Sequence, residues 1–301
     1  MNTRYAIGID IGATNVKGVV VKPSGEILSN TQFETGDRST AWATHVSQYV
    51  GEIEKENGPA YWIGVAAPGL ASSDRRSIAW MQGRLAAIQG FDWTTHLGRK
   101  KPVPVMNDAH AALIGEAWLG AAAGAQNAVM LTLGTGVGGA ILCDGRLLRG
   151  HIGRAGHLGH ISLNPEGTPD IVRTPGSLED AIGDHTVSHR TAGRFKSTTE
   201  LIAAFRAGDR QAAAVWLCSV KCLAAALASI INAVDPQTII LGGGIAQAGA
   251  ALFDPLKKYL DDFEWRPNDQ RVRIVPAVLG ERAGALGAAR HAMLLDTEEG
   301  L

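Results

Sequence analysis

The stretch AVMLTLGTGVGGAILCDGRLL, residues 128–148, decides the fold. It consists of an apolar strand, a turn of glycine and threonine, a second apolar strand, a polar hairpin turn and a further apolar segment, which is the pattern of a β-hairpin. Residues 5–28, YAIGIDIGATNVKGVVVKPSGEIL, repeat that order. Because the two copies are far apart in the chain, they predict a duplicated domain with two related halves.

Strands alternate with helices outside the two hairpins. YWIGVAAPG (61–69) and TIILGGGIA (238–246) read as strands that end in turns, and PVPVMNDAHAALIGEAWLG (102–120) reads as a strand that leads into a helix. This alternation is typical of α/β layering. We expect a first domain over residues 1–118 and a second over 119–281, with a C-terminal helix over 282–296 that folds back onto the first.

The composition excludes several classes of protein. Of the 301 residues, 28 are Lys or Arg and 29 are Asp or Glu, so charge gives no general attraction to nucleic acid or to an anionic membrane. The three cysteines, Cys143, Cys218 and Cys222, do not form a disulfide framework. The first residues, MNTR, lead into a strand without a signal region, and no apolar run approaches the roughly 18 residues of a bilayer span. We therefore expect a cytoplasmic protein.

The two glycine-rich turns expose backbone N–H groups that can hold phosphate oxygens. A single such turn is more simply a tight hairpin, but two at the same place in duplicated halves favour a polyphosphate held from both sides of a cleft. Asp10, at the end of the first strand, is positioned to meet a Mg²⁺ ion that such a ligand brings. The candidate phosphate-binding residues are Gly12, Thr14, Lys17, Gly134, Thr135 and Gly136.

Asn107 and Asp108 follow the strand PVPVM and precede a helix. Both residue types are preferred N-caps, so capping alone explains them. The alternative is a functional carboxylate at the carboxyl end of a strand, where ligands bind in open α/β sheets. A hydroxyl that attacks phosphorus must lose its proton, and a fixed aspartate can accept it.

These motifs occur together in one known family. The pattern Asp10-x-Gly12-x-Thr14-x-x-Lys17, the strand end Asn107-Asp108-Ala109, and LGTGVGGA, GHLGH, LGGGIA and GERAGALGAA follow the order seen in ROK-family sugar kinases, which the chain resembles over nearly its whole length. That family belongs to the actin/sugar-kinase/Hsp70 superfamily. The resemblance implies an α/β fold of two RNase H-like (actin-like ATPase) domains with a cleft between them. It also implies ATP with Mg²⁺, and phosphorylation of a hexose or N-acetylhexosamine hydroxyl.

The resemblance also assigns roles to residues. It implies that Asp108 is the general base and that Asp10 holds Mg²⁺ through water. We also expect a homodimer. The implied sugar-binding residues are Gly69, Asn107, His157, His160 and Glu179. The implied ATP-binding residues are Asp10, Gly12, Thr14, Lys17, Gly134, Thr135, Gly136, Gly243 and Gly244.

The sequence departs from the family at its zinc motif. In many members the histidine that matches His160 binds a structural zinc together with three cysteines. Here Asp170, Val172 and Ser177 stand at the cysteine positions within DIVRTPGSLE. A structural zinc needs four ligands, mostly thiolates, and valine can ligate nothing. We therefore expect no structural zinc.

Two further departures concern the sugar. His157 stands where the family has a sugar-binding glutamate, and an imidazole can either keep the same hydroxyl contact or shift the sugar preference. The loop 77–93, SIAWMQGRLAAIQGFDW, matches the family's sugar-contacting loop poorly. Trp80, Gln82 and Arg84 of this loop are candidates to reach a substrate, although such residues are more often packed or solvated.

The leading interpretation is a sugar kinase of the glucokinase, fructokinase or N-acetylhexosamine kinase type. One alternative is a ROK-like sugar-binding or regulatory protein without significant kinase activity; the early phosphate strand and the balanced charge argue against a DNA-binding repressor. Another alternative is a kinase that uses polyphosphate in place of ATP, which no residue excludes.

Overall fold

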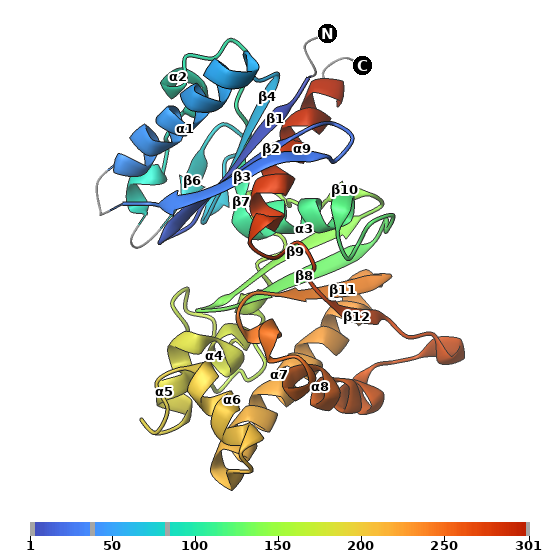
Figure 1. Ribbon diagram of the computed structural model, residues 1–301. Helices are drawn as coiled ribbons and strands as arrows, with labels where there is room; N and C mark the ends of the chain where they lie inside the picture. Colours follow the sequence, from blue (N-terminus) through green and yellow to red (C-terminus); the bar gives the residue numbers. More distant parts are fainter. Residues whose placement is uncertain (1–3, 37–39, 82–84, 299–301) are drawn as a thin grey trace. The chain divides into compact units, whose positions relative to one another are not determined.

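The computed structural model describes residues 4–36, 40–81 and 85–298 (Figure 1). The chain divides into two compact units. The first unit comprises the described residues up to Gly124, the segment Leu147–Ala155, and the described residues from Val278 onwards. The second unit comprises Ala125–Arg146 and Gly156–Ala277.

Each unit contains one five-stranded sheet, and the two sheets share the same strand order. In the first unit the order is β3-β2-β1-β4-β7, with β1 antiparallel to β2 and parallel to β4. In the second unit it is β10-β9-β8-β11-β12, with β8 antiparallel to β9 and parallel to β11. The predicted duplication and the α/β fold are confirmed. The strands are β1 (Ala6–Ile11), β2 (Asn15–Val21), β3 (Ile27–Glu34), β4 (Trp62–Ala67), β7 (Val105–Asn107), β8 (Ala128–Leu133), β9 (Val137–Cys143), β10 (Arg146–Leu147), β11 (Thr238–Gly242) and β12 (Arg273–Pro276).

Helices cover both faces of the first sheet. On one face, apolar side chains of β1 such as Ile7 and Ile9 pack against Trp42 and Val46 of α1. On the other face, Ala6 packs against Leu286 of α9. The remaining elements of this unit are α1 (Ala41–Asn57), β5 (Leu70–Ala71), β6 (Ile78–Trp80), η1 (Ala86–Ile88), α2 (Trp93–His96), α3 (Asp108–Leu119), η6 (Gly280–Arg282) and α9 (Ala283–Glu298).

Glycines allow α9 to lie directly against the sheet and against α3. A Cβ atom on Gly8 of β1 would lie 1.9 Å from the carbonyl oxygen of Ala285, and one on Gly287 of α9 would lie 1.7 Å from that of Ala111. Real Cβ atoms do not approach backbone this closely, so any larger residue would push the helix away. The GERAGALGAA motif therefore has a packing role, and it makes the C-terminal helix part of the first unit.

The second unit packs its helices on one face of its sheet around α7. Trp216, Leu223 and Leu227 of α7 are fully buried against residues such as Leu131 and Leu241 of the sheet. The remaining elements are η2 (Leu158–His160), α4 (Leu178–Ile182), η3 (Asp184–Thr186), α5 (Val187–Arg190), α6 (Thr198–Arg206), α7 (Arg210–Val234), η4 (Ile245–Ala248), α8 (Ala250–Phe263) and η5 (Pro267–Asp269).

The helix α7 corrects one prediction. By length and composition it could cross a membrane, and it is the one such helix in the described part of the chain. The expectation that no apolar run is long enough to span a bilayer is therefore wrong, because α7 meets both the length and the composition of such a span. More than half of its most apolar stretch is buried inside the protein, so packing in the core accounts for the apolar sequence.

Candidate active site

The carboxyl ends of three parallel strands meet at one edge of the first sheet. Asp10 of β1 is in register with Ala66 of β4, and Ala67 of β4 is in register with Asn107 of β7. Asp10 also lies opposite Lys17 across the β1–β2 hairpin. Ligands of open α/β sheets bind at such edges, so these residues stand where a site is expected.

Asp10 is held in an environment that disfavours its charge. Burial, followed by the charge of Asp108, raises the pKa of the Asp10 carboxyl from 3.8 to about 7, while Lys17 acts in the opposite direction. The start of α9 adds to the crowding, because a Cβ atom on Gly284 would lie 2.4 Å from Asp10 Oδ2. The structure thus brings Asp10, Lys17 and Asp108 together, and two neighbouring carboxylates so arranged attract a cation.

Asn107 caps α3 and also braces the turn after β4. Its Oδ1 accepts hydrogen bonds from the N–H groups of Ala109 (2.9 Å) and His110 (3.1 Å). Its Nδ2 donates to the carbonyl oxygen of Gly69 at 3.0 Å. The capping interpretation is therefore correct, and it leaves the second Nδ2 hydrogen available for a ligand.

Asp108 is the first residue of α3 and is partly exposed. Its Oδ1 accepts the N–H of Ala109 at 2.8 Å. The partial positive charge at a helix N-terminus favours a carboxylate at this position. Asp108 is consequently held at the start of α3.

The β1–β2 turn presents open backbone at its tip. Ala13 and Thr14 are exposed, and the N–H of Gly12 donates to Asn15 O at 2.9 Å. The buried Thr35 fixes the turn from behind, because its hydroxyl donates to Gly12 O (2.7 Å) and its N–H donates to Thr14 O (2.9 Å). A turn held this way is preorganised to bind an anion through N–H groups.

The β8–β9 turn of the second unit has the same design. The N–H of Gly134 donates to Gly136 O at 2.9 Å, and Thr135 is exposed at the tip. The end of β11 lies beside it, since a Cβ atom on Gly243 would lie 2.3 Å from Leu133 O. A Cβ on Gly244 would meet nothing within 4 Å. The second unit thus brings two predicted nucleotide-binding segments together.

His160 is oriented by a buried carboxylate. Its Nδ1 lies 2.8 Å from Oδ2 of Asp170, whose side chain is fully buried. The other oxygen, Oδ1, accepts the N–H groups of Val172 (3.0 Å) and Thr174 (2.8 Å). These hydrogen bonds, together with one from Ser177, hold the pKa of Asp170 below its usual range against the effect of burial.

Asp170 therefore organises the segment 170–179, which stands where the family's zinc motif was expected to be missing. Ser177 is buried and caps α4 by accepting the N–H of Asp180 at 3.2 Å. Val172 is exposed and coordinates nothing. Among the described residues, no three His, Cys, Asp or Glu side chains come close enough to hold a metal ion together.

Glu179 has a backbone partner that the sequence did not indicate. Its Oε2 accepts the N–H of Val137 at 2.8 Å, and a Cβ atom on Gly136 would lie 2.3 Å from the same oxygen. Glu179 therefore supports the β8–β9 turn from within the second unit.

His157 precedes η2 and is partly exposed, three residues before His160.

The candidate substrate-contacting residues of the loop 77–93 do not join the groups of site residues described above. Trp80 lies at the end of β6 with 42% of its surface exposed, whereas Gln82 and Arg84 lie outside the described residues. Sequence reasoning missed the roles of Thr35 and Asp170. The one signal for Asp170 in the sequence was an aspartate next to a run of turn residues.

Comparison with known proteins identifies the family. The profile of the ROK family matches residues 6–294. The chain belongs to the ROK family. It is 32% identical to a glucokinase of Thermotoga maritima over 94% of this chain and 95% of the relative. It is 30% identical to an N-acetylmannosamine kinase of Haemophilus influenzae, over 98% of each chain.

Solved ROK structures have the same fold. A ROK hexokinase of Thermus thermophilus matches with a TM-score of 0.84 and 30% identity, over 98% of this chain and 99% of that one. A ROK glucokinase of Streptomyces griseus, in complex with glucose and AMPPNP, matches with a TM-score of 0.77 and 27% identity, over 96% and 99%. The predicted actin-like ATPase fold is confirmed.

Proposed function

We propose that this ROK protein transfers the terminal phosphoryl group of ATP to a hydroxyl of a hexose or N-acetylhexosamine. The observation that carries the proposal is Asp108, a carboxylate fixed at a helix N-terminus beside Asp10 and at the carboxyl edge of the first sheet. The family supports the same reaction class, since its relatives include glucokinases and an N-acetylmannosamine kinase.

The nucleotide side of the proposal rests on the two turns. The N–H groups of Ala13 and Thr14 would contact phosphate oxygens from the first unit, and those around Thr135 would do so from the second. The open backbone at Gly244 leaves room for the rest of the nucleotide. A solved relative bound to AMPPNP supports ATP as the donor.

Asp108 would act as the general base. As the sugar oxygen forms its bond to the γ-phosphorus, the hydroxyl proton passes to the carboxylate, and the bond from phosphorus to the ADP oxygen breaks. Phosphoryl transfer depends mainly on positioning and charge stabilisation. Lys17, opposite Asp10 on the hairpin, supplies a positive charge near the transferred group.

The carboxylate chemistry of the first unit fits Mg²⁺. Mg²⁺ in kinases is usually held by one or two carboxylates together with substrate phosphates, and Asp10 is a carboxylate whose pKa is raised by burial and by the charge of Asp108, so a cation would favour its charged form. Asp10 would hold the ion through water. When bound, Mg²⁺ supplies positive charge that offsets the charge of the phosphate oxygens.

On the sugar side, we propose hydroxyl contacts from Asn107 and Gly69 in the first unit and from His157, His160 and Glu179 in the second. His160 is the best supported, because Asp170 fixes its ring and leaves Nε2 for a ligand. Homodimer formation and a cytoplasmic location stay predictions.

An ADP-release assay with a panel of sugars tests the proposal. Glucose, mannose, fructose, N-acetylglucosamine and N-acetylmannosamine are compared, each with and without Mg²⁺. We expect sugar-dependent and Mg²⁺-dependent ADP release for at least one sugar. ADP release at the background rate for every sugar, with ATP binding retained, would contradict the proposal and favour a sugar-binding or regulatory protein.

A further inference from the structure

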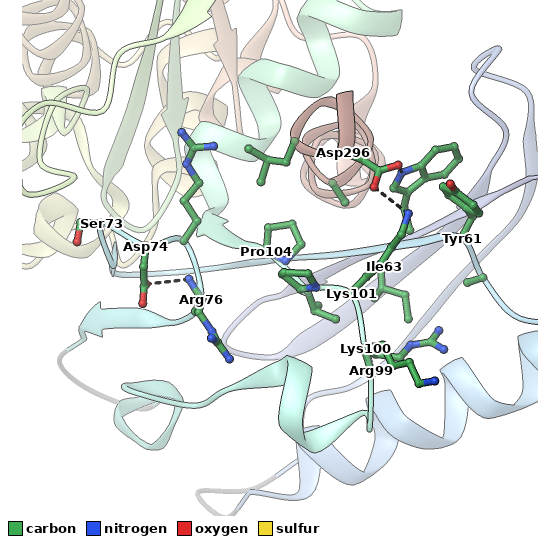
Figure 2. Close-up of a pocket in the computed structure, with 17 residues that line it drawn as sticks. Tyr61, Ile63, Ser73, Asp74, Arg76, Arg99, Lys100, Lys101, Pro104 and Asp296 are labelled. Atoms are coloured by element: carbon green, nitrogen blue, oxygen red, sulfur yellow. Dashed lines mark hydrogen bonds and ion pairs between the residues drawn. The ribbon is translucent and has the colours of Figure 1, made fainter. Parts of the chain in front are cut away.

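A cavity lies in the first unit, away from the candidate active site. Its volume is about 510 Å³, and it opens at the amino ends of β4 and β7, where Trp62 and Pro104 line it. Asp10, near the carboxyl end of β1, and Asp108, directly after β7, lie at the opposite edge of the same sheet. The walls come from the start of β4, the turn between β5 and β6, the loop before β7, and the C-terminal end of α9 (Figure 2).

Positive charge dominates the wall of this cavity. Five cationic side chains line it, against two carboxylates, Asp74 and Asp296. The cations are Arg75, Arg76, Arg99, Lys100 and Lys101. Figure 2 shows Arg76 on the turn between β5 and β6, and Arg99, Lys100 and Lys101 on the loop before β7. A cavity that concentrates one sign of charge raises the local concentration of ligands of the opposite sign.

Neighbouring groups position several of these cations without burying their charge. Lys101 Nζ lies 2.8 Å from Asp296 and 3.8 Å from the centre of the Tyr61 ring, and half of its side chain remains exposed. Among the described residues, Lys100 has no salt-bridge partner and is exposed. Arg76 pairs with Asp92 at 2.8 Å, on the outer side of the turn.

The net charge around the cavity stays positive when the acidic residues that pair with its cations from outside the wall are counted. Arg99 pairs with Glu54, which does not line the cavity, and Asp92 is likewise outside the wall. With these two acids added to the two in the wall, four carboxylates stand against five cations. These ion pairs are partly exposed, so an anion with several oxygens competes effectively for the cations.

Two arginines, Arg75 and Arg149, also act on a buried histidine next to the cavity. His291 lies on α9, one residue before the cavity-lining Ala292. Burial, and then the guanidinium groups of Arg75 and Arg149, lower the pKa of His291 to about 3, so the ring is neutral. Burial and Arg75 also lower the pKa of Arg149, with Asp74 acting in the opposite direction.

Part of the wall is apolar. Ile63, Pro102 and Pro104 lie next to the cations, and the rings of Tyr61 and Trp62 extend this surface. A bare inorganic anion would leave these groups without a partner. An organic phosphate ester, with a phosphate for the arginines and lysines and a carbon skeleton for the rings, matches both parts.

We propose that this cavity is a binding site for a small phosphorylated metabolite, a phosphate ester with a body of about the size of a sugar. The site is separate from the candidate active site and does not depend on the proposed kinase reaction.

Lysine footprinting tests the location directly. The rate at which an amine-reactive reagent acylates Lys100 and Lys101 is followed by mass spectrometry, with the exposed pair Lys257 and Lys258 of α8 as the internal control. We expect glucose 6-phosphate to slow labelling of the first pair by about threefold or more and to leave the second unchanged, since a bound phosphate stabilises the ammonium form and lowers the fraction of free amine that the reagent can acylate. Glucose alone should not protect, and inorganic phosphate should protect less.

Equal protection of both lysine pairs, or of neither, would overturn the proposal. Protection by inorganic phosphate as strong as that by glucose 6-phosphate would overturn the role of the apolar wall.

A matched pair of variants provides an independent measurement. Lys100→Gln/Lys101→Gln removes two cations from the cavity, and Lys257→Gln/Lys258→Gln makes the same change in charge on α8. In calorimetric titrations with glucose 6-phosphate, we expect the first variant to lose affinity by about tenfold or more, since each contact is a charge-assisted hydrogen bond. The control should bind as the wild type does.

Asp108→Asn separates this site from the proposed function, because it should abolish turnover and leave the footprint at Lys100 and Lys101 unchanged. If no sugar is phosphorylated but the footprint persists, the proposed kinase reaction fails and this site stands. Loss of the footprint in Asp108→Asn would instead mean that the ester binds at the candidate active site, which contradicts a separate cavity site.

Discussion

Replacing Asp170 by asparagine tests how the second unit orients His160. In the wild type a carboxylate can only accept, so the hydrogen in the 2.8 Å contact belongs to His160 Nδ1. A neutral ring then presents Nε2 with a lone pair, as an acceptor for a sugar hydroxyl. The amide of Asp170→Asn can keep Oδ1 toward the N–H groups of Val172 and Thr174, which places its NH₂ group against Nδ1. The ring must then move its hydrogen to Nε2, and the acceptor becomes a donor.

The size of the effect follows from the hydrogen bonds that change. A hydrogen bond to a charged group contributes about 1.5–3 kcal/mol, and the Tm shifts by roughly 2–4 °C per kcal/mol in chains of about 150–250 residues. From these ranges we expect the Tm of Asp170→Asn to fall by about 3–12 °C at most. The lost sugar contact is a neutral hydrogen bond of about 0.5–1.5 kcal/mol, so KM for the sugar should rise by up to about tenfold, with little change in KM for ATP.

Steady-state kinetics and thermal melting of two variants measure both effects. Asp209→Asn is the matched control, because Asp209 is also in the second unit, also accepts a backbone N–H (from Ala212, 2.8 Å) and also pairs with a cation (Arg194). Its sugar KM should not change. The reasoning is refuted if Asp170→Asn loses stability but keeps the wild-type sugar KM, because Asp170 would then only fix its loop.

Three further predictions concern charge, metal and sugar preference. Folding raises the pKa of Asp10 from 3.8 to about 7, so ionisation of this carboxyl destabilises the folded state increasingly from about pH 4 to pH 7 and by a constant amount above that. Asp10→Asn should therefore melt at a higher temperature than the wild type in the absence of Mg²⁺. The difference in stability should widen from pH 4 to pH 7 toward an upper limit of roughly 4 kcal/mol. Melting curves at pH 5, 6, 7 and 8 check this, and a gap that narrows with pH would contradict it. Metal analysis of purified protein should find no stoichiometric zinc; one tightly bound zinc per chain would contradict this and would make His157, His160, Asp170 and His151, which lies just upstream in the sequence, the candidate ligands. His157→Ala should raise KM for the sugar by up to about tenfold and leave KM for ATP unchanged, and His157→Glu should shift preference toward sugars typical of the family; a lower Tm with unchanged sugar KM in both variants would show a structural role.

Local patterns were sufficient to predict the two sheets. Each hairpin has its strands and its Gly/Thr turn within about 25 residues, so alternation and turn residues define β1–β2 and β8–β9 directly. The Asn107 cap was also predictable, since the residue type and the strand-to-helix junction are adjacent in the sequence. The packing role of Gly287 was not, because the backbone it touches at Ala111 is far away in the chain.

Long-range contacts explain what the sequence did not reveal. The segment Leu147–Ala155 belongs to the first unit, where Arg149 donates to Ser72 O at 2.8 Å and His110 Nε2 lies 3.0 Å from Ala155 O. No periodicity encodes such contacts. The pairing of His160 with Asp170 depends on a turn held by hydrogen bonds to a buried carboxylate, and the cationic cavity depends on loops that meet at the amino ends of β4 and β7.

The central claim is that Asp108 removes the proton from a sugar hydroxyl that ATP phosphorylates. Single-turnover phosphorylation of the preferred sugar by the wild type and by Asp108→Asn, with ATP affinity measured on both, tests it most directly. The amide keeps the shape of the side chain but cannot take the proton, so the rate should fall by about 10²–10⁴-fold while ATP affinity changes by less than about threefold. A variant that keeps more than about a tenth of the wild-type rate would contradict the account.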